Sequence, residues 1–259
     1  MTRHGMTWAR AIAPVVGIVV FLALWEAFVQ IRDVRPFILR APSDIVRHLA
    51  KFPMDFLRAS GTTSLHAVTG FLVALALAIC VGAALAASPF LERASQPVLV
   101  LIVVTPFASY IGSVVLWLGS GDAPVRFITT LVCFPAFVFG AVAGMRSADP
   151  ASRELFASVA ASRFEVLWRL RLPSALPTLF TTARFNTGLA LIATYLVEGQ
   201  NFANAGLGAI GRRAAGYSLA DPQWATVFCM AMIGTLWLVL LGALERVVLR
   251  WHASQRMLR

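Results

Sequence analysis

The amino-acid sequence predicts an all-α polytopic membrane protein with about six transmembrane helices. Hydrophobic residues make up 59% of the 259 residues and charged residues only 13%, which is about half of what a soluble domain usually carries. The charged residues are bunched, and long apolar stretches separate them. Because these stretches are continuous, they favour helices. Membrane-spanning strands would give short alternating segments of about ten residues.

Each apolar stretch is long enough to cross the hydrocarbon core, which takes about 20 helical residues. Glu26 lies inside the first stretch and Arg184 inside the fifth. We expect one transmembrane domain over residues 1–259, with a long loop at 146–176. The expected spans are 11–31, 63–87, 95–118, 125–145, 177–198 and 223–248.

The distribution of basic residues predicts the orientation of the chain. Arginine and lysine are enriched in cytoplasmic loops, and they favour a cytoplasmic N-terminus and C-terminus and a cytoplasmic loop 146–176. The first external segment, Arg32 to Arg58, is more basic than this rule expects. Since the net charge of +10 lies between apolar stretches, we expect lipid headgroups and proteins as its partners, and no nucleic acid.

The loop 146–176 contains start signals for two short helices. Asp149 followed by Pro150 is typical of an N-cap with proline at the first helical position. Ser162 and Glu165 form the S-x-x-E pattern of a capping box, which indicates a second helix that begins there.

We expect these two helices to meet at a corner near Ala161. The second should end before Pro173, because proline disfavours helix at the residue that precedes it. Such a basic, amphipathic segment could lie on anionic headgroups or dock on a partner protein. Its acids, Glu154 and Glu165, and its internal cap favour a folded docking surface.

The stretch ELFASVAASRFEVLWRLRLPSALP, residues 154–177, resembles the cytoplasmic signature loop of the permease subunits of ATP-binding-cassette importers. The residues that match the family pattern are Glu154, Ala161, Ser162, Leu172, Pro173 and Pro177. The residues that depart from it are Leu155, Phe156 and Ala160, where the family usually has alanine, alanine and glycine. Other stretches, among them LWLGSGDAPVRFI and LIATYLVEGQNFANAGLGAIG, are similar to the permeases of the nitrate, taurine and aliphatic-sulfonate group.

The resemblance implies a permease subunit in the bacterial inner membrane, whose loop couples it to two separate ATPase subunits. ATP and magnesium would be bound by those ATPases, so this chain would need no cofactor. Further implied partners are an external substrate-binding protein and a second permease copy, in a homodimer or with a different permease in a heterodimer. The implied coupling residues are Glu154, Ala160, Ala161, Ser162, Arg163, Phe164, Leu172 and Pro173.

The cargo implied by the resemblance is a small anion such as a sulfonate or nitrate. A vitamin or a vitamin precursor stays open as the alternative, because related permeases carry such molecules.

Two glycine motifs suggest other functions that the rest of the sequence does not favour. Gly206 to Gly211 spell the dinucleotide pattern G-x-G-x-x-G, but they follow an apolar helix rather than a strand, so we expect an external loop there. The chain also lacks a Walker A motif, since its one lysine, Lys51, is not part of G-K-[ST].

Gly119 to Asp122 spell the G-x-G-D pattern of intramembrane aspartyl proteases. That chemistry needs two carboxylates that share a proton, and no second aspartate lies in an expected span. His66 has no serine motif to act with, and the scattered cysteines and histidines do not form a metal-binding pattern. We therefore expect no catalytic residues and no metal.

A secondary carrier or a channel is the remaining alternative. Carriers commonly show internal repeats, and we find none here.

Polar residues inside apolar helices are costly and often line a transport pathway. The candidates are Thr105, Pro106, Tyr110, Asn186, Thr194 and Glu198. Pro106 should kink the third helix. Structural explanations stay open, because threonine commonly bonds the backbone of its own helix and Glu198 could cap or pair near the outer end.

Overall fold

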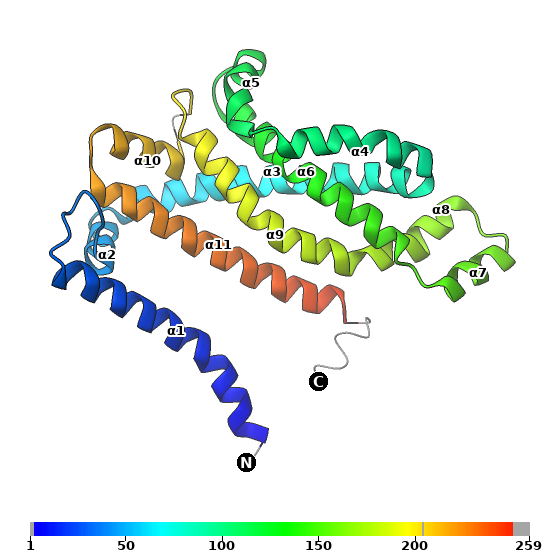
Figure 1. The fold of residues 1–259 in the computed structure, drawn as a ribbon, viewed down its shortest axis with the longest axis horizontal. Helices are drawn as coiled ribbons and strands as arrows, with labels where there is room; N and C mark the ends of the chain where they lie inside the picture. The colour runs from blue at the N-terminus through cyan, green and yellow to red at the C-terminus, as the bar shows by residue number, and fades with distance from the viewer. Residues whose placement is uncertain (1–2, 204, 251–259) are drawn as a thin grey trace.

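The computed structural model of the protein describes residues 3–203 and 205–250. Every regular element in these ranges is helical, which confirms the predicted fold class (Figure 1). The elements are α1 (Arg3–Ile31), α2 (Pro42–Lys51), α3 (Pro53–Ala87), α4 (Pro89–Val104), η1 (Phe107–Tyr110), α5 (Ile111–Leu118), α6 (Asp122–Arg146), α7 (Pro150–Ser158), α8 (Arg163–Val166), η2 (Leu167–Arg171), α9 (Leu172–Glu198), α10 (Leu207–Gly216) and α11 (Ala220–Val248).

Helices α3, α6 and α9 pack side by side and form the core. Phe71 of α3 meets Phe137 of α6 edge-on, with ring centroids 5.0 Å apart. Small residues let α6 and α9 come close, since a Cβ atom added to Gly144 would lie 2.8 Å from the Cα atom of Ala175. Close approach at small residues is the usual way in which helices associate in lipid.

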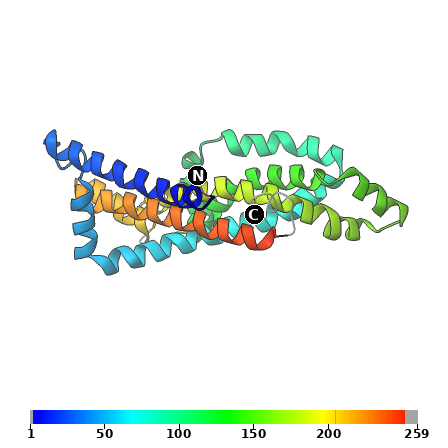
Figure 2. The same ribbon diagram turned by 90° about the horizontal axis from the view of Figure 1, so that it is seen from below.

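Helix α1 stands apart from this core and is joined to it at one end (Figure 1). Figure 2 shows α2 running crosswise to the long helices at that end. The Glu26 carboxylate accepts hydrogen bonds from the Ser43 N–H (2.9 Å) and hydroxyl (2.7 Å), and Trp25 lies edge-on to Trp224 of α11. The apolar flank of α1 is exposed, as suits a surface that faces lipid or another helix.

Four helices of the described chain are long and apolar enough to cross a membrane: α1 (within Ile12–Ile31), α3, α6 and α11. A fifth span results if α4 is joined to η1 and α5, but the chain bends by 86° between them. The expected span 95–118 is therefore broken at Pro106, more sharply than the predicted kink. Helix α9, at 27 residues, is long enough but more polar than the others. The predicted count of about six thus exceeds by one what length and composition support.

The predicted end of the second short helix before Pro173 is wrong. Helix α8 continues through η2, a π-helical turn, directly into α9. In this turn the Leu172 N–H donates to the carbonyl of Leu167, five residues back. A widened turn of this kind tolerates the proline ring, which would clash with the carbonyl four residues back in a regular helix.

Candidate functional site

The loop between α6 and α9 is held by two helix caps, and both confirm sequence predictions. The Asp149 carboxylate accepts a hydrogen bond from the Ser152 N–H at 3.0 Å and so caps α7. At the start of α8 the Glu165 N–H donates to the Ser162 hydroxyl oxygen (3.2 Å), and the Ser162 N–H donates to the Glu165 carboxylate (3.0 Å). The backbone and hydroxyl hydrogen bonds from Ser162 hold the pKa of Glu165 below its ordinary value, because they favour the charged carboxylate.

The corner between the two helices lies at Ala160, next to the predicted position. The Ala161 N–H donates to the Phe156 carbonyl and the Ala160 N–H to the Ala157 carbonyl, both at 3.0 Å. This is the Schellman pattern that closes many helices, and its turning residue adopts a left-handed conformation. Ala160 does so, with φ of 49°. An alanine there costs about 1 kcal/mol relative to the right-handed conformation.

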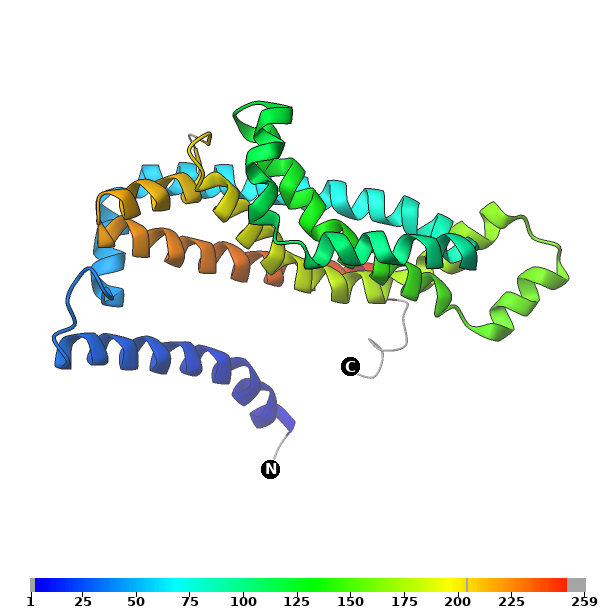
Figure 3. The ribbon, with the colours of Figure 1, turned by 45° about the horizontal axis from the view of Figure 1, so that its top comes forward.

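The loop forms a tip, α7–α8, that projects from one end of the bundle (Figure 3). Leu155, Val159 and Phe164 on the tip, and Trp168 in η2 directly after it, are each more than half exposed. Phe164 and Trp168 lie together, with ring centroids 5.9 Å apart. An apolar patch of this kind on a projecting loop is typical of a surface that binds another protein.

The tip is anchored to the core at its root, the region where α6 ends and where η2 leads into α9. Arg171 of η2 donates to the Ala86 carbonyl of α3 at 3.3 Å. Arg146, at the end of α6, pairs with Glu92 of α4 at 2.5 Å. Leu167 and Leu172 pack against the core cluster of α3, α6 and α9. The segment α8–η2–α9 is thus one continuous helical rod that is anchored to the core.

The predicted coupling residues fall into two places. Glu154, Ala160, Ser162, Arg163 and Phe164 are exposed at the tip and Ala161 is half-buried beside them. Leu172 and Pro173, in contrast, lie half-buried at the root, where α9 begins.

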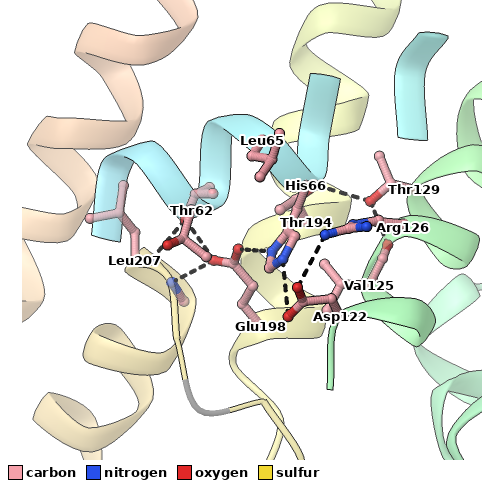
Figure 4. A network of polar contacts seen from close by, with 12 residues as sticks. Thr62, Leu65, His66, Asp122, Val125, Arg126, Thr129, Thr194, Glu198 and Leu207 are labelled. Carbon is pink, nitrogen blue, oxygen red and sulfur yellow. Dashed lines mark hydrogen bonds and ion pairs between the residues drawn. The ribbon is translucent and has the colours of Figure 1, made fainter. Parts of the chain in front are cut away.

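A buried polar cluster lies where the end of α9 meets the start of α10 (Figure 4). Its centre is Glu198, the last residue of α9, which has no exposed surface. The carboxylate contacts the Nδ1 atom of His66 at 2.8 Å and accepts bonds from the Thr63 hydroxyl (2.7 Å) and the Gly208 N–H (3.2 Å). The Nε2 atom of His66 lies 3.3 Å from the carboxylate of Asp122.

The cluster continues outward through α6. Asp122 also pairs with Arg126 at 3.1 Å, and both side chains are partly exposed. Deeper in, the hydroxyls of Thr129 and Thr194 lie 2.9 Å apart. The cluster thus joins α3, α6, α9 and the start of α10 through charged and hydroxyl groups.

The glycines of the G-x-G-x-x-G motif shape this cluster. Gly206 has φ of 98°, and a Cβ atom there would collide with the Glu198 carboxylate. A Cβ atom at Gly208 would collide with the Tyr195 carbonyl. The Leu207 N–H donates to the Thr63 hydroxyl oxygen at 2.8 Å. The motif therefore lets the N-terminus of α10 reach a carboxylate, which helix N-termini favour.

The predicted pathway residues are not gathered at one place. Thr105 and Pro106 are exposed at the α4–α5 break and Tyr110 is half-buried nearby. Asn186, Thr194 and Glu198, all on α9, have no exposed surface. The Asn186 amide donates to the Cys133 carbonyl of α6 at 3.0 Å.

The sequence interpretation missed Thr63 and His66 as partners of Glu198, and it missed Asp122 as the second partner of His66. The available signal was a histidine and a threonine one helical turn apart inside an apolar stretch. Their shared partner, Glu198, lies more than 130 positions away along the chain, and no local pattern reveals such a pairing.

Comparison with known protein families decides what kind of chain this is. The family model of the binding-protein-dependent transport system inner membrane component matches residues 70–250. The chain belongs to this family. The match covers most of the core, the whole tip, and the part of the polar cluster that α6, α9 and α10 contribute, and it confirms the family resemblance seen in the signature loop.

Individual members of the family support the assignment over nearly the whole chain. The riboflavin transport system permease protein RibX of Chloroflexus aurantiacus is 31% identical over 92% of this chain and 90% of its own length. The taurine transport system permease protein TauC of Escherichia coli is 28% identical, covering 91% of this chain and 88% of TauC. The formylaminopyrimidine transport permease protein ThiX of Halalkalibacterium halodurans is 27% identical, covering 95% of this chain and 98% of ThiX.

A solved structure shares the fold of this family member. It shows an inward-facing conformation of the MetNI methionine ABC transporter, and one of its chains matches with a TM-score of 0.68 and 16% identity. The match covers 76% of this chain and 98% of that chain. The chain is thus an ABC importer permease of the type I family, a membrane component of a transport system.

Proposed function

We propose that this permease is driven by a separate ATPase subunit that docks on the α7–α8 tip. The observation that carries the proposal is the exposed apolar tip on a rod that runs without a break into the membrane-spanning bundle. A docked ATPase that moves the tip would move α9 with it, because a capped, anchored rod transmits a displacement instead of absorbing it. ATP and magnesium would be bound by that ATPase.

We further propose that two permease copies form the transport pathway, with two ATPases on the cytoplasmic side and a binding protein outside. In support, α1, α4 and α11 keep large apolar faces exposed in the single chain. The exposed break at Thr105 and Pro106 is the better candidate for lining the pathway. The buried candidates of α9 already have partners inside the chain.

For the cargo we propose a small anion such as a sulfonate, with a vitamin or vitamin precursor as the alternative. TauC and the putative aliphatic sulfonates transport permease proteins SsuC favour the first class, while ThiX and RibX favour the second. Uptake of radiolabelled taurine, compared with riboflavin, into cells that express the complete transporter would separate these classes.

Docking is tested by co-purifying the permease with the ATPase encoded beside it. The variant Glu154→Arg with Arg163→Glu swaps two exposed charges at the tip without changing the net charge. The matched control, Asp55→Arg with Arg58→Glu, makes the same swap on exposed residues in the first turns of α3. These residues lie far from the end of α3 that contacts Arg171.

We expect the tip variant to recover at least tenfold less ATPase per permease than the wild type does. The control should recover the ATPase at the wild-type ratio. Thermal unfolding of both permeases shows whether they are folded. Equal recovery of the ATPase with both variants would contradict docking at the tip.

A further inference from the structure

The rod that begins at the tip ends in the buried polar cluster. Arg163 is the first residue of α8, and Glu198, the centre of the cluster, is the last residue of α9. At the usual helical rise the rod is roughly 50 Å long. The proposed ATPase-docking surface and the cluster are therefore opposite ends of one continuous helix.

The cluster binds α10 to this rod through two of its first backbone N–H groups. The Gly208 N–H donates to Glu198, and the Leu207 N–H donates to Thr63, whose own hydroxyl donates to Glu198. Glu198 thus holds the start of α10 both directly and through Thr63 of α3. No other described polar group of α9 does the same: Thr187, for example, donates only to the Ala183 carbonyl of its own helix.

The imidazole of His66 lies between two carboxylates, those of Glu198 and Asp122. A neutral imidazole can donate from only one ring nitrogen. Both contacts are hydrogen bonds to ionised carboxylates only when the ring is positively charged. Arg126, beyond Asp122, supplies a further positive charge. With the ring charged, the charges alternate in sign along this line, and moving Glu198 out of place would then leave His66 without its buried partner.

We propose that Glu198 is a positioning residue of the transport cycle: it latches α10 to α3 and α9, and movement of the rod opens and closes this latch. The proposal rests on docking of the ATPase at the tip. The contacts that open are those that Glu198 makes with Thr63, with His66 and with the start of α10. Hydrogen bonds that are either formed or broken give two discrete states. Such states suit a switching element better than a gradual deformation does.

The latch can be observed through its own backbone N–H groups. We would measure hydrogen–deuterium exchange in the permease–ATPase complex in proteoliposomes, without nucleotide and with ATP, magnesium and vanadate. In the wild type we expect exchange at the Leu207 and Gly208 N–H groups to change at least tenfold between the two states. N–H groups around Thr187 in the middle of α9 should not change.

Variants connect the latch to ATP turnover. Thr63→Val removes the hydroxyl at nearly constant volume, whereas Thr63→Ser keeps it, and Thr187→Val removes a buried hydroxyl that lies outside the latch. We expect Thr63→Val to raise the kcat of ATP hydrolysis per complex at least threefold with an unchanged KM for ATP, because the ATPase no longer works against the latch. Thr63→Ser and Thr187→Val should stay within twofold of the wild type.

Different outcomes separate the latch from the docking proposal. If the ATPase co-purifies but nucleotide leaves exchange at Leu207 and Gly208 unchanged, the latch is overturned and docking stands. A loss of folded Thr63→Val complex with no change in kcat per complex would show a structural role only, which also overturns the latch. Failure of the wild-type permease to retain the ATPase would overturn both.

Discussion

Ala160 shows how one backbone conformation shapes the docking tip. Its φ of 49° turns the chain between α7 and α8, and the hydrogen bonds of Ala160 and Ala161 to α7 require that turn. Glycine reaches such a conformation without the steric cost that a Cβ atom brings. The chain therefore carries a strained residue at the centre of the surface proposed to bind the ATPase.

We expect Ala160→Gly to retain the ATPase at least as well as the wild type, since it removes strain of about 1 kcal/mol. Ala160→Val should lower ATPase recovery several-fold, because a β-branched side chain is strongly disfavoured at positive φ. Co-purification of the ATPase with each variant measures the effect. Wild-type recovery with Ala160→Val would mean that the left-handed turn is not needed for docking.

The packing of α6 against α9 depends on a glycine that has no room for a side chain. A Cβ atom at Gly144 would meet the backbone of Ala175, which cannot move aside as a flexible side chain can. Helix α9 carries several polar residues, and its contact with α6 encloses some of them. Close packing thus lets α9, which is more polar than the other long helices, lie within the bundle.

Gly144→Val should therefore destabilise the permease by about 1–3 kcal/mol, the usual cost of overpacking. Gly188→Ala on α9 is the control, because a Cβ atom there meets nothing within 4 Å. Thermal unfolding of the detergent-purified variants measures both. A Gly144→Val protein that unfolds at the wild-type temperature would show that α6 and α9 can separate without cost.

Two prolines show why element boundaries are hard to predict. Pro106 lies at a break that bends the chain by 86°, whereas Pro173 lies inside a helix that continues. Both remove a backbone donor and favour a boundary in the sequence. The difference arises from the surroundings: η2 widens the turn before Pro173, and Leu167 and Leu172 pack that turn on the core.

The molecule has two ends of different character. The α7–α8 tip projects from one end, and α2 and α10 lie towards the other (Figures 1 and 2). The polar cluster lies where the end of α9 meets the start of α10. The basic residues of the sequence predict that the tip lies in the cytoplasm, so α2 should lie on the external side.

We expect a membrane-impermeant maleimide to label Arg163→Cys in inside-out vesicles only, and Lys51→Cys in right-side-out vesicles only. Both residues are exposed, and the exposed native Cys80 is first replaced by alanine. Gel-shift detection of the label reads out the orientation. The reverse pattern would place the tip outside and would contradict both the predicted orientation and docking of a cytoplasmic ATPase.

The sequence by itself determined the features that depend on neighbouring residues: the apolar spans, the caps at Asp149 and Ser162, and the signature loop of the family. Caps and helical periodicity depend on residues a few positions apart, so they can be recognised in the sequence. Only the tertiary structure decided that Glu198 meets Thr63 and His66, which lie 135 and 132 positions away. It also decided that the tip and Glu198 share one rod, because packing against α3 and α6 carries the helix past Pro173.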